Sequence, residues 1–311
     1  MKLSIIIPVY YNEPNLWPLY NDLKEKILSR QDIECEIVMV NDGSKDRSYQ
    51  IMQEISSQDK RVRIFSLSRN FGSHAAILCG LEHCTGDCAV IKAADLQEPT
   101  ELIIQMLESW KKGFNVVLAA RKSRPESGTS TFFSNAYYWL VRKTSFPNMP
   151  KTGFDIYLID RKVIDVIKRL DEKNSALTGQ ILWSGFRTDI VYYDRLERKA
   201  GKSRWTLRKK IRLVSDTLYS FSTFPITFVS AVGAISFFAA LIWAFVILGF
   251  KFAGKIEISG WTSLFIFSLA AFGIIMLTLG IIGNYLWRAF DASRNRPPYI
   301  VEDTGERDSH E

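Results

Sequence analysis

Two long apolar stretches near the carboxyl terminus constrain this chain more than any other feature. Residues 217–250 and 258–287 contain no Asp, Glu, Lys or Arg. A transmembrane helix needs about 20 apolar residues, and both stretches exceed that length. A buried helical hairpin in a soluble core is disfavoured because such helices seldom run past about 20 residues without a charge. We therefore expect two transmembrane helices, at about residues 224–250 and 259–287.

Basic residues flank this apolar pair. Eight precede it between residues 198 and 212, three follow it between 288 and 296, and the connecting loop holds only Lys251, Lys255 and Glu257. The positive-inside rule then predicts a multi-pass protein of the inner (plasma) membrane, with the large domain and both termini cytoplasmic. The formal net charge of +7 is concentrated beside the membrane, so we expect a membrane partner and no nucleic acid.

Short apolar runs alternate with amphipathic stretches from the amino terminus to about residue 117. The expected strands cover residues 3–9, 36–41, 62–68, 88–94 and 116–120, and the expected helices cover residues 15–28, 44–56, 73–83 and 100–112. The expected helix caps are Asn12, Asp42 or Ser44, and Thr100. Strands that alternate with helices predict an α/β domain around a mostly parallel sheet.

The chain has four cysteines in or next to these expected elements: Cys35, Cys79, Cys84 and Cys88. We interpret them as reduced, small core residues. A zinc site that also uses His74 and His83 is the alternative, although the cysteine spacing contains no C-x-x-C pair.

Polar turns follow four of the expected strands. Ligands bind at the carboxyl ends of parallel strands, so the chemistry is expected in these turns. Asp95 and Gln97 flank one residue, and their oxygens suit a hard divalent cation that bridges diphosphate oxygens. Asp42 is either a helix cap or an acceptor of hydrogen bonds from a base or ribose. No G-x-G-x-x-G or G-x-x-x-x-G-K motif occurs, so neither a Rossmann dinucleotide site nor a P-loop is predicted.

Eight short strings extend this pattern along the chain. They are PVYYNEPNL at 8–16, NDGSKD at 41–46, SRNFGSHAA at 68–76, ADLQEP at 94–99, AAR at 119–121, FDIYLIDRKV at 154–163, RKAGKSRW at 198–205 and RPPYIV at 296–301. In this order they resemble the family 2 glycosyltransferases. The resemblance covers nearly the whole chain and points to the branch of dolichyl-phosphate mannose synthase and the bacterial polyprenyl-phosphate glycosyltransferases. Two carboxyl-terminal spans fit the bacterial members.

The resemblance implies a GT-A fold, which is a Rossmann-like catalytic domain with a mostly parallel sheet. It also implies a nucleotide sugar as donor, Mg²⁺ or Mn²⁺ as cofactor, and inversion at the anomeric carbon. The implied nucleotide-sugar-binding residues are Pro8, Tyr10, Glu13, Asp42, Asp95 and Gln97. The implied metal ligands are Asp95 and Gln97. The implied catalytic residues are Asp95, Arg121 and Asp155.

A polyprenyl phosphate such as undecaprenyl phosphate is the acceptor that the resemblance implies. The expected lipid-phosphate-binding residues are Arg121, Ser134, Arg198, Lys202 and Arg204. By analogy with phosphorylated side chains, the phosphate has a second pKa near 6, so its oxygen is already anionic near neutral pH. Asp155 therefore need not act as a base, and it could orient groups in the site.

The domain organisation follows from these expectations. Residues 1–205 form a cytosolic GT-A domain, 206–222 a juxtamembrane amphipathic helix, 223–288 a two-helix anchor and 289–311 a cytosolic tail, disordered from residue 302. The first expectation for the donor is UDP-glucose, and the product is a polyprenyl-phosphate-sugar for cell-surface glycan modification. The family is also consistent with a homo-oligomer.

Three alternatives stay open. Ala93 and Asn41 stand where many relatives carry aspartates, and Asn284 stands where an acidic residue is frequent. Ala93 and Asn41 support a catalytically silent membrane adaptor or a lipid-presenting subunit. A processive polysaccharide synthase is disfavoured because no Q-x-x-R-W string occurs and two spans are too few for a translocation channel. The third alternative is a synthase that uses GDP-mannose as its donor.

Overall fold

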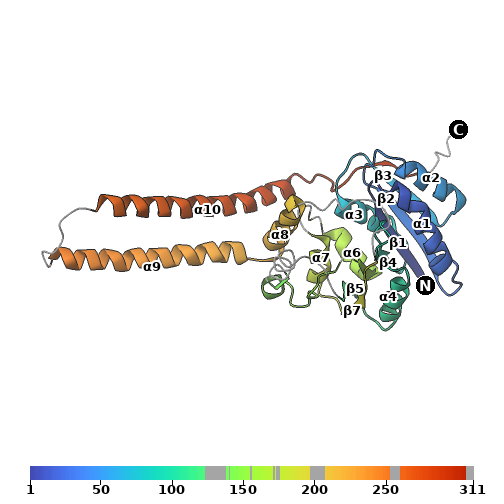
Figure 1. Ribbon diagram of the computed structural model, residues 1–311, viewed down its shortest axis with the longest axis horizontal. Helices are drawn as coiled ribbons and strands as arrows, with labels where there is room; N and C mark the ends of the chain where they lie inside the picture. Colours follow the sequence, from blue (N-terminus) through green and yellow to red (C-terminus); the bar gives the residue numbers. More distant parts are fainter. Residues whose placement is uncertain are drawn as a thin grey trace. The chain divides into compact units, whose positions relative to one another are not determined.

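The structure, a computed structural model, describes residues 1–122, 138–139, 141–154, 156–170, 172, 176–196, 207–252 and 260–305. The chain forms two compact units, Met1–Val214 with Arg296–Glu311, and Ser215–Asn295. In chain order the elements are β1 (Lys2–Val9), α1 (Glu13–Leu23), the π-helical turn η1 (Lys24–Leu28), β2 (Glu34–Asn41), α2 (Ser48–Gln58), β3 (Val62–Leu67), α3 (Ser73–His83), β4 (Cys88–Ile91), α4 (Glu101–Lys111), β5 (Val116–Arg121), β6 (Ile156–Asp160), α6 (Arg161–Arg169), α7 (Leu177–Trp183), β7 (Thr188–Tyr193), α8 (Leu207–Phe221), α9 (Phe224–Phe252), α10 (Trp261–Ser293) and β8 (Val301–Asp303) (Figure 1).

One sheet organises the first unit. Over the described residues it has eight strands in the order β7-β5-β6-β4-β1-β2-β3-β8. The β1–β2, β1–β4, β2–β3 and β5–β7 pairs are parallel, whereas β6 and β8 pair with their neighbours in the antiparallel direction. The predicted α/β class with a mostly parallel sheet is confirmed.

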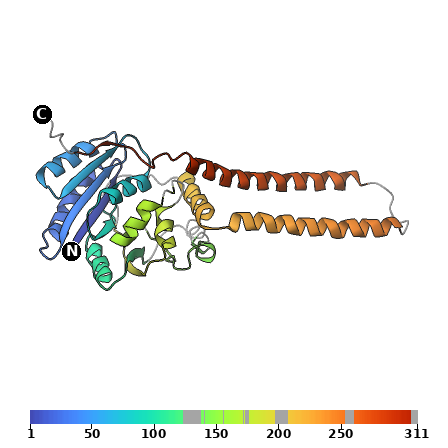
Figure 2. The same cartoon turned by 180° about the vertical axis from the view of Figure 1, so that it is seen from behind.

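Helices cover both faces of the sheet, as the two opposite views show (Figures 1 and 2). Side chains alternate along a strand, so neighbouring residues of β1 enter different layers. Ile5 and Ile7 belong to the core that packs against α1, α2 and α4. Ile6 belongs to the second core, which packs against α3, α6 and α7. The cysteines Cys35, Cys79, Cys84 and Cys88 are buried in these two layers, as expected of small core residues.

The start of α2 differs from the prediction. This helix begins at Ser48, so neither Asp42 nor Ser44 is its cap. Gly43 has a φ of +66°, which turns the chain away from helical geometry directly after β2. The Ser44 hydroxyl instead accepts a hydrogen bond from the main-chain N–H of Tyr11, 3.0 Å away. The polar residues after β2 therefore bind neighbouring loops and do not begin a helix.

Two other expected caps occupy the correct position without forming a capping hydrogen bond. Asn12 precedes α1, and its Oδ1 accepts from the N–H of Tyr10 at 3.0 Å. Thr100 precedes α4, and its hydroxyl donates to the carboxylate of Asp22 on α1. Asn12 thus stabilises its own turn, and Thr100 stabilises a tertiary contact between α4 and α1.

The carboxyl-terminal segment returns to the sheet. Val301 pairs with Leu67 and Asp303 pairs with Ser66, and the N–H of Ser68 donates to the carbonyl of Ile300 at 3.0 Å. Without β8 the edge of β3 would expose unpaired main-chain groups. The expectation of disorder from Glu302 onward is therefore wrong for Glu302 and Asp303.

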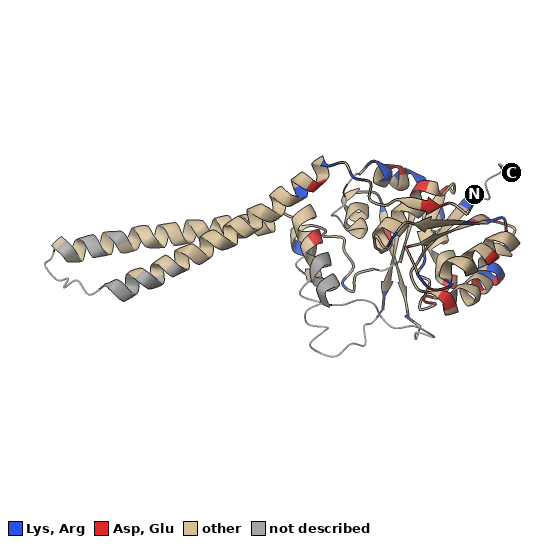
Figure 3. Cartoon of the chain, turned by 90° about the horizontal axis from the view of Figure 1, so that it is seen from above, with Lys and Arg blue, Asp and Glu red and all other residues tan. Residues whose placement is uncertain are grey.

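The second unit contains the two apolar helices. α9 has 29 residues and α10 has 33. Their candidate spans, Phe224–Trp243 and Ala270–Ser293, are 6% and 0% buried, and each is long and apolar enough to cross a membrane. Apart from Lys251 at the end of α9, the described residues of both helices carry no charge until the carboxyl-terminal end of α10 (Figure 3). A helix of a soluble core would bury its apolar face, so this exposure favours a lipid environment.

Arg288 joins α10 to α8 inside the second unit. Its Nη2 donates to Asp216 Oδ1 at 2.6 Å, and its Nη1 donates to Ser220 Oγ at 3.1 Å. The guanidinium also lies 5.3 Å from the ring centroid of Tyr219, which packs edge-on against Tyr285. These contacts fix the last turns of α10 against α8.

Candidate active site

The carboxyl ends of β1, β2, β3, β4, β5 and β7 meet at one edge of the sheet. Parallel pairing places Val9 opposite Asn41, and Arg121 opposite Tyr193. Pro8 near the end of β1 and the turns that carry the predicted donor residues Tyr10, Asp42 and Asp95 therefore share this edge. Ligands bind at such an edge in open α/β sheets.

Asp42 connects the turn after β2 to the start of α3. This buried residue accepts hydrogen bonds at Oδ1 from the N–H of Phe71, 2.7 Å away, and at Oδ2 from the N–H of Gly72, 3.0 Å away. Gly72 is the N-cap of α3 and has a φ of +102°. The negative charge thus lies at the positive end of a helix dipole, where it is stabilised. Asp42 holds two site loops together as one unit.

Gly43 allows these two loops to approach closely. A Cβ at this position would lie 2.5 Å from the carbonyl carbon of Arg69 and 2.6 Å from the main-chain nitrogen of Asn70. No L side chain fits such a contact, and the φ of +66° also favours glycine. The hydrogen bonds of Asp42 therefore depend on the glycine beside it.

Asn41 has a structural role between β2 and β3. Its Nδ2 donates to Ser66 Oγ at 3.0 Å, and its Oδ1 accepts from the N–H of Ser44 at 3.1 Å. An aspartate could accept the second bond but could not donate the first. The amide therefore satisfies a buried position between β2 and β3.

The turn after β1 is bonded to the turn after β2. The N–H of Asn12 donates to Ser48 Oγ at 3.0 Å, and the N–H of Arg47 donates to Glu13 Oε2 at 3.1 Å. Tyr10 and Tyr11 pack edge to face, with ring centroids 4.7 Å apart, and Tyr11 has a φ of +54°. Pro8 lies in β1 opposite Val40. The structure thus keeps the expected donor residues of β1 and β2 in one connected wall.

Asp95 and Gln97 lie in a tight turn after β4. The N–H of Gln97 donates to Asp95 Oδ1 at 3.3 Å, and Leu96 between them has a φ of +59°. Their side chains share a cationic neighbour, because Arg195 Nη2 donates to Gln97 Oε1 and lies 3.9 Å from Asp95 Oδ2. Two oxygens of the kind that Mg²⁺ and Mn²⁺ prefer thus converge on one point.

The donor set fits a divalent cation only in part. The described residues contain no group of three or more His, Cys, Asp or Glu that could hold a metal ion. One carboxylate and one amide oxygen leave most of an octahedral shell to other ligands, such as water and phosphate oxygens. These residues therefore fit a metal that arrives with a diphosphate.

Lys92 stabilises the turn that carries Asp95 and Gln97. The side chain is 2% exposed, and its Nζ donates to the carbonyl of Glu98 at 2.8 Å. Burial lowers the pKa of the Lys92 ammonium, while the carboxylates of Glu98, Asp22 and Asp95 act in the opposite direction. The ammonium therefore anchors the end of the turn that presents Asp95 and Gln97.

Arg121 is the last residue of β5. It lies opposite Tyr193 at the end of β7, and its carbonyl accepts from Thr152 Oγ1 at 3.0 Å. Two residues after Tyr193 comes Arg195, so the β5–β7 pairing brings Arg121 and the partner of Asp95 to the same edge. Sequence analysis predicted Arg121 but missed Arg195 and Lys92. For Arg195, the available signal was the strand pattern of residues 188–193, which end two positions before it.

Five predicted site residues lie outside the described residues: Ser134, Asp155, Arg198, Lys202 and Arg204. Phe154, two residues before β6, is buried, and Leu196 is the last described residue before Arg198.

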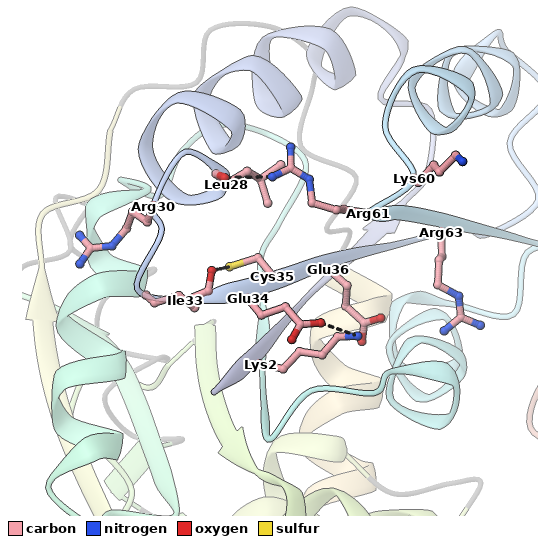
Figure 4. Close-up of a pocket in the computed structure, with 10 residues that line it drawn as sticks. All are labelled: Lys2, Leu28, Arg30, Ile33, Glu34, Cys35, Glu36, Lys60, Arg61 and Arg63. Atoms are coloured by element: carbon pink, nitrogen blue, oxygen red, sulfur yellow. Dashed lines mark hydrogen bonds and ion pairs between the residues drawn. The ribbon is translucent and has the colours of Figure 1, made fainter.

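A pocket of about 390 Å³ lies at the opposite edge of the sheet, at the amino ends of β1, β2 and β3 (Figure 4). It is lined by Lys2, Leu28, Arg30, Ile33, Glu34, Cys35, Glu36, Lys60, Arg61 and Arg63. Most of its cations have carboxylate partners, such as Glu34 for Lys2 at 3.3 Å and Asp59 for Arg61 at 2.8 Å. We place the chemistry at the strand carboxyl ends, because the turns there converge and this pocket has no such constellation.

The model of Glycosyl transferase family 2 matches residues 4–166. Relatives match along almost the full length. The chain is 39% identical to the uncharacterized glycosyltransferase YkcC of Bacillus subtilis (strain 168), over 97% of this chain and 94% of that protein. It is 34% identical to the prophage bactoprenol glucosyl transferase homolog of Escherichia coli (strain K12), over 97% and 99%. It is 33% identical to the bactoprenol glucosyl transferase of Shigella phage SfV, over 97% and 98%.

Solved structures are more distant. Mannosyl-3-phosphoglycerate synthase from Rubrobacter xylanophilus is 16% identical, with a TM-score of 0.49 over 70% of this chain and 72% of that one. The family match and the sheet order together confirm the expected GT-A class.

Proposed function

The chain belongs to glycosyl transferase family 2, and from this premise we propose that it transfers one sugar from a nucleotide sugar to a polyprenyl phosphate at a membrane surface. The observation that carries the donor half is the convergence of Asp95 and Gln97 oxygens on one cationic position, at the strand edge that also presents Arg121. A nucleoside diphosphate with Mg²⁺ or Mn²⁺ is the ligand chemistry that suits this arrangement.

The acceptor half rests on the second unit and on the relatives. Two relatives carry bactoprenol glucosyl transferase in their names and match at 33–34% identity over 97% of this chain. The helices α9 and α10 are long and apolar enough to cross a membrane, which is where a polyprenyl chain resides. We infer that undecaprenyl phosphate is the acceptor and that UDP-glucose is the first donor to test.

The basic residues around the spans support one membrane orientation. Under the positive-inside rule they favour cytoplasmic termini and a cytoplasmic catalytic domain. Within that topology we assign residues 1–205 to the catalytic domain, 206–222 to a juxtamembrane helix, 223–288 to the anchor and 289–311 to a tail that contributes β8. Arg198, Lys202 and Arg204 are then available to bind the lipid phosphate.

The proposed chemistry depends on placement and charge. The phosphate oxygen of the acceptor attacks the anomeric carbon on the side opposite the nucleotide, so one displacement inverts that centre. A bound metal ion would neutralise charge on the leaving diphosphate, and Asp95 and Gln97 are the residues that would hold it. Arg121 stabilises the same developing charge. Asp155 orients groups, because the anionic acceptor has no proton to lose.

The test uses full-length protein in detergent. It is incubated with undecaprenyl phosphate, Mg²⁺ or Mn²⁺, and labelled UDP-glucose, UDP-N-acetylglucosamine or GDP-mannose. The expected product is a sugar lipid that extracts into chloroform, and Asp95→Ala should abolish it. Asp32→Ala is the matched control, because this exposed carboxylate pairs with Arg30 and precedes the amino end of β2, away from the strand carboxyl ends. No sugar lipid from any donor would refute the proposal and favour the silent adaptor.

A further inference from the structure

Arg195 contacts both residues assigned to the metal. Its Nη2 donates to Gln97 Oε1 and lies 3.9 Å from Asp95 Oδ2, and its side chain is 32% exposed. Asp95 is less exposed, at 18% of its side chain. Arg195 is therefore the more exposed partner in this contact.

Main-chain contacts hold the same segment against the turn. The N–H of Leu196 donates to the carbonyl of Gln97 at 2.9 Å, and Gln97 Nε2 donates to the carbonyl of Leu196 at 3.4 Å. Asp194, which directly precedes Arg195, forms an ion pair with Lys122 at 2.9 Å. Residues 194–196 thus form a docked latch, and residues 197–206 follow it directly.

A guanidinium and a divalent cation compete for these oxygens. Arg195 already contacts Gln97 Oε1 and lies beside Asp95 Oδ2, and the charge of the guanidinium repels that of a cation bound at the same oxygens. Arginine keeps its charge at any pH of interest, so it cannot relieve the repulsion by losing a proton. Its planar fork, however, matches phosphate oxygens in a bidentate arrangement.

We propose that Arg195 is an exchangeable counter-cation of the Asp95–Gln97 turn, which moves from these oxygens to the donor diphosphate when a divalent cation binds there. This inference rests on the proposed function.

Binding of Mn²⁺ alone tests the exchange without requiring turnover. Electron paramagnetic resonance on nucleotide-free full-length protein would compare wild type with Arg195→Gln. We expect Arg195→Gln to bind Mn²⁺ about 3- to 5-fold more tightly, which corresponds to the loss of a partly exposed like charge. The same variant should bind UDP with Mn²⁺ more weakly than wild type, and Arg195→Lys should be intermediate in both measurements.

Arg187→Gln is the matched control. Arg187 directly precedes β7, at the end of the strand away from the latch, and its guanidinium lies 4.4 Å from the ring centroid of Phe114. Its removal should leave both affinities unchanged. Equal or weaker binding of Mn²⁺ by Arg195→Gln would overturn the exchange, as would Mn²⁺ binding that is insensitive to Asp95→Ala. These outcomes differ from failure of the proposed function, in which no variant forms sugar lipid whatever its affinity for Mn²⁺.

Hydrogen–deuterium exchange tests the movement of the latch. Addition of UDP and Mn²⁺ to wild type should change the protection of peptides that cover residues 194–196, and Asp95→Ala should abolish the change. Unaltered protection of this segment in wild type, under conditions where UDP and Mn²⁺ are bound, would show that the latch does not move.

Discussion

Asp42 Oδ2 accepts a hydrogen bond from the main-chain N–H of Gly72 at 3.0 Å, across 30 residues of sequence. The contact joins the end of β2 to the N-terminus of α3, so two loops of the proposed donor site are held as one. Asp42, which is expected to bind the nucleoside, therefore also stabilises the fold.

Asp42→Asn should weaken both the fold and donor binding. The amide replaces one acceptor oxygen with an NH₂ group that faces a main-chain N–H, so a buried contact becomes repulsive. We expect a loss of about 1–3 kcal/mol in the free energy of unfolding. Chemical denaturation in detergent and a UDP titration measure the two effects. Unchanged stability would contradict the structural role, and Asp32→Asn provides a surface control.

Gly43→Ala should be far more damaging than Gly113→Ala. Both glycines have positive φ, +66° and +91°, so both substitutions introduce backbone strain of about 1–3 kcal/mol. Only at Gly43 does the new Cβ meet main-chain atoms, at 2.5 Å from Arg69 and 2.6 Å from Asn70, whereas nothing lies within 4 Å at Gly113. Thermal denaturation of the two variants separates strain from collision. Equal destabilisation would indicate that the close approach of the loops is not rigid.

The stability contributed by Asp59 should disappear in acid. The Arg61 guanidinium beside it holds the pKa of the Asp59 carboxyl to about 2, below its ordinary value of 3.8, and Tyr20 donates a further hydrogen bond at 3.0 Å. A lowered pKa in the folded state contributes stability above the unfolded pKa, and this stability is lost as pH falls through the folded value.

Asp59→Asn should therefore be less stable than wild type at pH 7, by about 1.5–3 kcal/mol for lost hydrogen bonds to a charged group. The difference between the two proteins should shrink as the pH falls from about 4 toward about 2. Urea denaturation across this range measures it. A difference that stays constant with pH would show that the Asp59 carboxylate is not the source.

The strand β8 should contribute to the stability of the first unit. A chain in which a Gly/Ser linker replaces residues 215–295 keeps β8, and it should be soluble without detergent because both apolar helices are gone. A second chain that also lacks residues 296–311 should melt at a lower temperature and aggregate, since β3 becomes an open edge. Equal melting temperatures would mean that the pairing of β8 with β3 adds little.

Much of the fold could be read from local pattern. Apolar runs that alternate with amphipathic stretches located β1 to β5 within a few residues, because burial of alternate side chains writes a period into the sequence. The strands β6, β7 and β8 were not predicted, because their assignment depends on pairing with distant strands. β8 is three residues long and acquires its structure only from β3.

The candidate site divides in the same way. Asp95 and Gln97 could be predicted because they follow a recognisable strand, and Arg121 was predicted from the resemblance to the family. Arg195 could not, because its contact with Asp95 crosses 100 positions of sequence and depends on the parallel pairing of β5 with β7. The role of Asp42 was also ambiguous, because helix caps and loop-binding carboxylates have the same composition.

The sequence by itself determined the two apolar helices, since 34 and 30 consecutive residues without a charged side chain already specify a lipid environment, wherever the helices pack. It also determined the α/β class, because side-chain periodicity is a local property. Only the tertiary structure decided which polar side chains meet at the strand ends. It also decided which of them form hydrogen bonds with main-chain groups. Those outcomes depend on register and loop approach, such as the contact that Gly43 permits between residues 26 and 27 positions apart, and no local pattern encodes them.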